Sequence, residues 1–201
     1  QPLKDLVMKI YEFITSVPFP EKWLNEAVQD FDVENQDFAN TKWGSILIDY
    51  ARKQTNDSIK NLVMAKNMLE GIPNLVDCYE VVCKNMNSLK MIDFSSWDTA
   101  CRDTQNIDWL KWSAKRKYEE GEKELKDSAK QIRDEVKKNL SKIFTDWFSV
   151  NSEENLKDIK AMYPVLSSIK NLVFEFEKKF SKKKRDRNIV DFTDIEHFAL
   201  K

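Results

Sequence analysis

The sequence predicts an all-α protein, and composition and patterning both lead to that prediction. Glycine and proline are scarce, with 3 and 5 among 201 residues, whereas sheet proteins need many turns built from these residues. Hydrophobic residues make up 41% of the chain, which is enough for one sizeable core. Along most of the chain they recur every three or four residues, the spacing of an amphipathic helix.

The chain is predicted to begin with two helices that a rigid corner separates. Apolar residues over Leu3–Ser16 share one helical face. Pro18 and Pro20 then form the corner, and Pro20 suits the first turn of a helix that runs to about Phe31. Residues 32–41 follow as a polar loop.

A third helix is expected after this loop. Thr41 is a candidate N-cap for a helix that runs past Tyr50. Polar residues interrupt its apolar stripe near Asp57, so a break there is an alternative to a continuous helix. Gly71 and Pro73 end this region.

The middle of the chain predicts one clear helix and one short one. The clear helix covers residues 74–92, and Ser95 or Ser96 could cap the short helix that follows. Residues 102–120 show no dominant period. The sequence therefore leaves this stretch unassigned.

The second half predicts two long helices, over about 121–148 and 153–182. Apolar residues recur in steps of three and four over Leu125–Trp147, close to a heptad seam, and again over Leu156–Phe180. Because only a short polar connection separates the two helices, we expect a long antiparallel helical hairpin. Pro164 should kink the second helix or mark a hidden N-terminus.

Positive charge is concentrated in the second half of the chain. Residues 1–109 hold 11 Lys and Arg against 17 Asp and Glu, whereas residues 110–201 hold 22 against 17. A basic run near the predicted end of the last helix supplies the candidate DNA-binding residues Lys182, Lys183, Lys184, Arg185 and Arg187. Such a run could contact phosphates. It could equally be a solvated helix end whose cations complement the helix dipole.

A second candidate DNA-binding stretch is Trp109–Lys117, in which tryptophans alternate with cations. Surfaces that bind single strands combine aromatic and basic side chains in this way. The stretch adds Lys115, Arg116 and Lys117 to the DNA-binding candidates. Tryptophan at helical spacing is also common in cores, so a packing role stays open.

Catalytic and metal sites find little support in the sequence. Only three glycines are present, so no glycine-rich phosphate loop can be built. His197 is the only histidine and is interpreted as a structural residue. Cys78 and Cys83 lack further zinc ligands, so no metal site is predicted. Asp191 and Asp194 could be a carboxylate pair for a metal, but capping of a helix is the simpler interpretation.

The expected cellular compartment follows from three features of the sequence. No run of about 18 apolar residues is present, so no membrane partner is expected. The chain shows no signal peptide, and its three cysteines cannot all pair. The reducing cytoplasm is therefore the expected compartment.

The C-terminal residues predict continuation into a longer protein. Thr193 and Glu196 fit a capping box, which would start a helix with only about two turns before Lys201. A short helix at a free end is marginal. We therefore expect the helix to continue in a longer parent.

The tail KRDRNIVDFTDIEHFALK resembles superfamily 1 helicases of the UvrD type, which carry an aspartate–phenylalanine–x–aspartate–leucine element after their inserted 1B domain. Here the element consists of Asp191, Phe192 and Asp194, with Ile195 in the leucine position. Its fuller form resembles the AddA (RexA) component of AddAB helicase–nucleases. The segments IYEFITSVPFPEKWL, KDSAKQIRDEVKKNL and YPVLSSIKNLVFEF resemble the same family.

The resemblance implies an excised 1B domain. Residues 1–188 would be the helical insertion, and residues 189–201 would begin a helix that re-enters the missing 1A motor domain. The parent would be an ATP-dependent DNA helicase and exonuclease that uses ATP and Mg²⁺, acts with the AddB (RexB) subunit on DNA ends, and serves double-strand break repair and recombination. No ATPase or nuclease motif lies in these residues, and no cofactor is expected in them.

Three functional hypotheses remain at this point. The first is an accessory domain that contacts single-stranded or duplex DNA. The second is a helical protein-interaction or scaffolding domain without DNA contact. The third, a free-standing enzyme that uses His197 or the Asp191–Asp194 pair, has the least support in the sequence.

Overall fold

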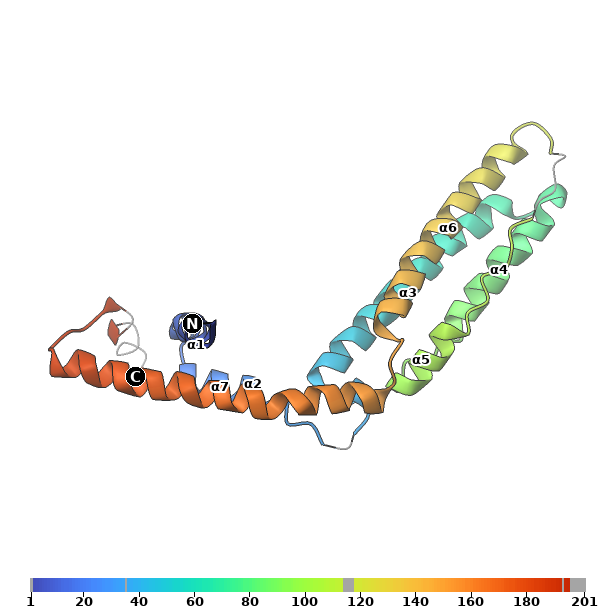
Figure 1. Ribbon diagram of the computed structural model, residues 1–201. Coiled ribbons are helices and arrows are strands. Elements are labelled where there is room, and N and C mark those ends of the chain that lie inside the picture. The colour runs from blue at the N-terminus through green and yellow to red at the C-terminus, as the bar shows by residue number, and fades with distance from the viewer. Residues whose placement is uncertain (1, 35, 114–117, 193, 196–201) are drawn as a thin grey trace. The chain divides into compact units, whose positions relative to one another are not determined.

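The protein is all-α, as predicted. The computed structural model describes residues 2–34, 36–113, 118–192 and 194–195, and within them every regular element is a helix (Figure 1). The chain forms two compact units. Unit 1 combines residues 1–35 with 156–201, and unit 2 consists of residues 36–155.

Unit 2 is a helical bundle built around its longest helix, α3. The elements in chain order are η1 (Phe38–Asn40), α3 (Lys42–Leu69), η2 (Pro73–Leu75), α4 (Val76–Lys90), α5 (Trp97–Gln105) and α6 (Glu122–Trp147). Helix α3 packs against both α4 and α6. Its buried apolar stripe consists of Ile48, Ala51, Leu62, Ala65 and Leu69.

The break considered near Asp57 does not occur, because α3 continues through this residue to Leu69. Thr55 and Ser58 lie in the packed face and are 3% and 8% exposed. Small side chains at these positions continue the buried stripe that a longer polar residue would interrupt. The polar residues Thr55 and Ser58 are therefore part of the core of unit 2.

An aromatic cluster closes the end of unit 2 where α5 and α6 meet η1. The indole of Trp97 is buried, with its ring centroid 4.5 Å from Phe38 and 4.8 Å from Phe148. Its Nε1 donates a hydrogen bond to the Val150 carbonyl at 2.9 Å. Ser96 caps α5 through a capping box with Thr99, which confirms the predicted cap.

The N-terminus of α3 requires a glycine. Thr41 is the N-cap, as predicted, and its Oγ1 accepts a hydrogen bond from Gly44 N at 3.0 Å. The same hydroxyl donates to the Phe38 carbonyl at 2.7 Å, which draws η1 onto the first turn. A Cβ atom on Gly44 would lie 1.9 Å from that carbonyl oxygen. The two elements can therefore approach this closely only when residue 44 has no side chain.

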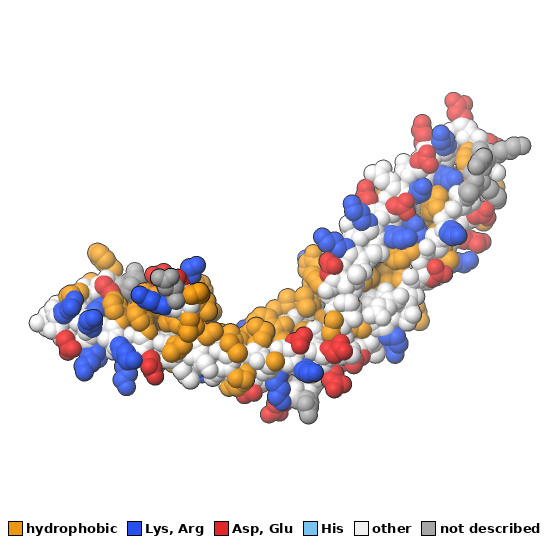
Figure 2. Space-filling model, viewed as in Figure 1, with side chains coloured by type: hydrophobic (Ala, Val, Ile, Leu, Met, Phe, Trp, Pro, Cys, Tyr) orange, Lys and Arg blue, Asp and Glu red, His pale blue; other side chains and the backbone are white. Residues whose placement is uncertain are grey.

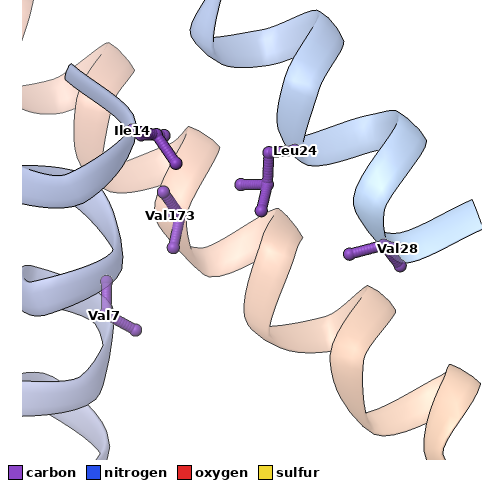
Figure 3. Close-up of a cluster of buried hydrophobic side chains, with 5 residues drawn as sticks. All are labelled: Val7, Ile14, Leu24, Val28 and Val173. Atoms are coloured by element: carbon purple, nitrogen blue, oxygen red, sulfur yellow. The ribbon is translucent and has the colours of Figure 1, made fainter. Parts of the chain in front are cut away.

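Unit 1 packs α1 (Pro2–Thr15) and α2 (Pro20–Gln29) against α7 (Ser152–Asp186), which belongs to unit 1 from Leu156 onward. Its buried core consists of Val7, Ile14, Leu24, Val28 and Val173. Figure 3 shows Ile14 of α1 and Val173 of α7 pointing toward each other. Proline stands at the first turn of α2, as the sequence predicted.

The long antiparallel hairpin is not confirmed, although both of its helices form. Helix α6 matches the predicted 121–148, and α7 extends four residues beyond the predicted 153–182. The seam of α6 packs within unit 2, mainly against α3, whereas Val173 of α7 packs with α1 and α2. Pro164 lies inside α7 rather than at its N-terminus.

Candidate nucleic-acid interface

The candidate DNA-binding cations of the basic run lie in the last two turns of α7 and at the residue that follows the helix. Lys182, Lys183, Arg185 and Arg187 are exposed, and Figure 2 shows lysine and arginine side chains along the C-terminal part of this helix. Within the described residues, none of these four side chains forms an ion pair with a carboxylate. Their ammonium and guanidinium groups are thus available to solvent and to anions.

Lys184 differs from its neighbours and is not part of that exposed set. It is only 9% exposed, and its Nζ lies 5.1 Å from the centre of the Phe180 ring. The same Nζ donates to Asp191 Oδ2 at 2.9 Å and to Asp194 Oδ1 and Oδ2 at 2.7 and 2.8 Å. These acceptors use all three ammonium protons, so the structure argues against the predicted phosphate contact by Lys184.

A signal for the burial of Lys184 is present in the sequence. Position 184 lies four residues after Phe180 and eleven after Val173, so the three residues share one face of α7. The charges of the basic run do not by themselves reveal this periodicity, because buried and exposed lysines carry the same charge. The helical phase separates Lys184 from the exposed cations on either side of it.

Asp191 and Asp194 cap each other, which supports the capping interpretation of this pair. The Asp194 N–H donates to Asp191 Oδ1 at 3.0 Å, and the Asp191 N–H donates to Asp194 Oδ2 at 3.1 Å. The hydrogen bond from Lys184 and then that from the Asp194 backbone hold the pKa of Asp191 below its ordinary value. Phe192, the second residue of the family element, is 86% exposed.

The end of α7 is fixed by a Schellman motif. Ile189 N donates to the Lys184 carbonyl at 3.0 Å and Asn188 N donates to the Arg185 carbonyl at 3.0 Å. Asn188 supplies the left-handed residue, with φ of 53°. Asparagine is the usual alternative to glycine at this position. The turn of Asp191 and Asp194 therefore starts only a few residues after a defined helix end.

The tryptophans of the second candidate stretch pack against the protein. Trp109 lies beneath Arg133, whose guanidinium carbon is 5.8 Å from the ring centre. Arg133 is 4% exposed and donates to Asn85 Oδ1 at 3.1 Å and to the Leu110 carbonyl at 2.6 Å. The aromatic part of this stretch is therefore anchored in unit 2. The candidates Lys115, Arg116 and Lys117 lie outside the described residues.

No catalytic constellation is visible in the described residues. They contain no group of three or more His, Cys, Asp or Glu side chains that could hold a metal ion. His197 and the predicted capping pair of Thr193 and Glu196 lie outside the described part. Over the helices that are described, none is both long and apolar enough to cross a bilayer.

Comparison with known proteins places the sequence next to one group of large enzymes, the A subunits of ATP-dependent helicase/nucleases. No protein-family profile matches the sequence. The A subunit from Clostridium kluyveri is 31% identical over 202 residues, which covers 98% of this chain and 16% of that protein. The A subunits from Ruminiclostridium cellulolyticum and Clostridioides difficile are 32% and 31% identical, with the same coverage of both chains. The chain thus spans about one sixth of the length of these relatives.

Proposed function

Because this chain belongs to the AddA family, as a homologue of one segment of the ATP-dependent helicase/nuclease A subunits, we propose that it is an accessory domain that contacts DNA phosphates through the end of α7. The activity of the longer relatives belongs to the same proposal: ATP-driven unwinding and digestion of DNA ends, together with a second subunit, in double-strand break repair. The 1B-like insertion over residues 1–188 and the re-entry into a motor domain over 189–201 stay predictions.

The observation that carries the proposal is the set of exposed cations without carboxylate partners. Lys182, Lys183 and Arg185 lie within one turn of α7, and Arg187 directly follows its last residue, Asp186. A phosphate backbone presents closely spaced negative charges, and each contact releases bound counterions. Such a cluster gives affinity without base specificity, which suits a protein that must act on any DNA end.

ATP and Mg²⁺ belong to the parent protein in this proposal. The sequence contains no glycine-rich phosphate loop, so both would bind in parts of the parent that this chain does not include. The role of the present residues is then to hold nucleic acid beside the reaction rather than to perform it.

A salt titration of DNA binding tests the proposal. We expect the chain to bind a fluorescently labelled DNA fork weakly in an anisotropy assay, with affinity that falls as salt rises. Each phosphate contact adds about 0.7–0.9 to the slope of log affinity against log salt. The triple variant Lys182→Ala, Lys183→Ala, Arg185→Ala should lower that slope by about 2–3.

A matched control separates local contact from net charge. Lys123, Lys138 and Lys142 are exposed on α6, and their replacement by alanine removes the same three charges from unit 2. This control should change the slope by less than the value of one phosphate contact, about 0.7–0.9. If both triple variants lower the slope equally, DNA binding depends on net charge and not on contacts at the end of α7.

The alternative function is a helical protein-interaction or scaffolding domain without direct DNA contact. Exposed aromatic side chains in unit 1 favour it, because Phe13 and Phe19 are 57% and 62% exposed. The Phe13 ring lies 5.3 Å from that of Trp23, so these residues form an apolar surface outside the core. Absence of DNA binding even at low salt, with retained binding to the second subunit, would select this alternative.

A further inference from the structure

The end of α7 presents two chemically different faces. Lys182, Lys183 and Arg185 face solvent, whereas Lys184 points back along the apolar face toward Phe180. The ring of Phe180 itself stacks on Phe176, with centroids 5.6 Å apart. One turn of helix therefore separates a candidate phosphate surface from a partly buried ion-pair site.

Lys184 is the only described side chain that joins both carboxylates of the turn by an ion pair. Asp191 and Asp194 lie close enough to cap each other's backbone, so their two negative charges repel. A buried ammonium between them offsets that repulsion and satisfies three acceptor positions. Removal of Lys184 would leave two neighbouring carboxylates, 42% and 28% exposed, without their shared cation.

We propose that Lys184 is a positioning residue that locks the turn of Asp191 and Asp194 onto the end of α7 and so fixes the direction in which the chain leaves this helix. The Schellman motif sets the first part of this exit through Asn188, and the ion pairs set the second part. The described residues after α7 are thus held at two places, by the backbone hydrogen bonds of the Schellman motif and by the ion pairs of Lys184.

The consequence for the parent protein rests on the proposed function. A rigid exit transmits a displacement of the neighbouring domain to α7, whereas a flexible exit would absorb it. Phe192, which is 86% exposed, lies between the two aspartates in the sequence. The lock itself belongs to this chain and can be tested without any enzyme activity.

In the described part of the chain, four ionisable groups lie around Lys184. Asp191 and Asp194 bind it directly, and Tyr11 and Glu177 interact with this region electrostatically. Tyr11 packs edge-on against Phe176 at 4.9 Å. The carboxyl of Asp191 is the most informative reporter, because its pKa is lowered first by the hydrogen bond from Lys184.

The test uses NMR on the isotopically labelled 201-residue chain with Lys184→Met, and Lys183→Met as the matched control at the exposed neighbour. In Lys184→Met we expect the Asp191 carboxyl to titrate at a higher pH than in the wild type, because the hydrogen bond from Lys184 is lost. The amides of Asp191 and Asp194 should lose hydrogen-exchange protection by at least about tenfold, since each donates to a charged acceptor. Lys183→Met should leave both readouts at the wild-type values.

Two further results keep the proposal open to refutation. If Lys184→Met fails to fold, Asp194→Asn replaces it, because the amide keeps a capping oxygen and removes one negative charge; the protection of the Asp191 amide should still fall. Unchanged Asp191 titration and unchanged amide protection in a folded Lys184→Met variant would overturn the proposal. DNA binding is a separate readout. If Lys184→Met releases the turn but keeps normal DNA affinity, both inferences are supported. If the turn depends on Lys184 but the wild-type chain does not bind DNA, only the proposed function is refuted.

Discussion

Replacement of Gly44 by alanine should lower the free energy of unfolding, because of one contact with the Phe38 carbonyl oxygen. Alanine is the better helix former by about 1 kcal/mol, so propensity alone predicts that Gly44→Ala stabilises α3. The structure predicts the opposite, because the new Cβ would lie 1.9 Å from the Phe38 carbonyl oxygen. That oxygen is held by Thr41 Oγ1 at 2.7 Å and Thr41 N at 3.0 Å, so it cannot move without loss of the helix cap.

The magnitude follows from the two costs and the one gain. Loss of an N-cap costs about 1 kcal/mol, and overpacking of a tight site costs about 1–3 kcal/mol. After subtraction of the propensity gain, the free energy of unfolding should fall by about 2 kcal/mol. Displacement of η1 would also weaken the hydrogen bond from Phe38 N to Ser152 Oγ, which is 2.7 Å long.

Urea unfolding followed by far-ultraviolet circular dichroism measures this change. Ser45→Ala is the matched control, because Ser45 is exposed one residue further along the same helix. Its free energy of unfolding should stay within about 0.5 kcal/mol of the wild type. A Gly44→Ala variant as stable as the wild type, or more stable, would refute the steric argument.

Three further predictions follow from the described contacts. Asn188→Ala should cost about 1 kcal/mol while Asn188→Gly should be neutral or stabilising in urea unfolding, because residue 188 has a φ of 53° and only glycine adopts it without strain. Arg133→Met should destabilise the protein by about 3 kcal/mol because it leaves buried acceptors unpaired, whereas the exposed Lys130→Met should change stability by less than about 0.5 kcal/mol. The pKa values of Asp103 and Asp191 are lowered, chiefly by hydrogen bonds from the Asp93 backbone and from Lys184; their stabilisation is present above the ordinary aspartate pKa and lost as pH falls through the lowered values. The melting temperature should therefore drop over that acidic window, and Asp103→Asn should flatten the drop; equal pH profiles would contradict the assignment.

Helix positions were predictable because they depend on local information. Apolar residues at steps of three and four located α6 and α7, and the predicted starts at 121 and 153 lie within one residue of Glu122 and Ser152. Caps such as Thr41 and Ser96 were found for the same reason, since a cap bonds to its own helix. Local patterns fix the length and the buried face of a helix.

Helix partners were not predictable in the same way. The seam of α6 specifies that one face is buried, but an apolar stripe fits many other stripes. Its main partner, α3, was itself ambiguous, because Thr55 and Ser58 disguised a continuous buried face. The expected hairpin relied on a short connection after Trp147, and the connection does not decide which helices pack together.

Contact between DNA and the end of α7 stays a prediction from charge. Lys182, Lys183 and Arg185 are exposed, as such a contact would require. The separate role of Lys184 depends on helical phase and on two carboxylates seven and ten residues away. A turn that folds back on a helix end leaves no periodic signal in the sequence.

The hydrogen bond between Phe38 and Ser152 joins residues 114 positions apart near the two ends of unit 2. A module whose first and last residues meet can be added to a chain, or taken out of it, without a change in the path of what surrounds it. Residues 36–155 therefore have the form of an insertion nested inside unit 1. Shorter versions of this domain could arise by deletion of that whole module, with α2 joined to α7 by a brief loop.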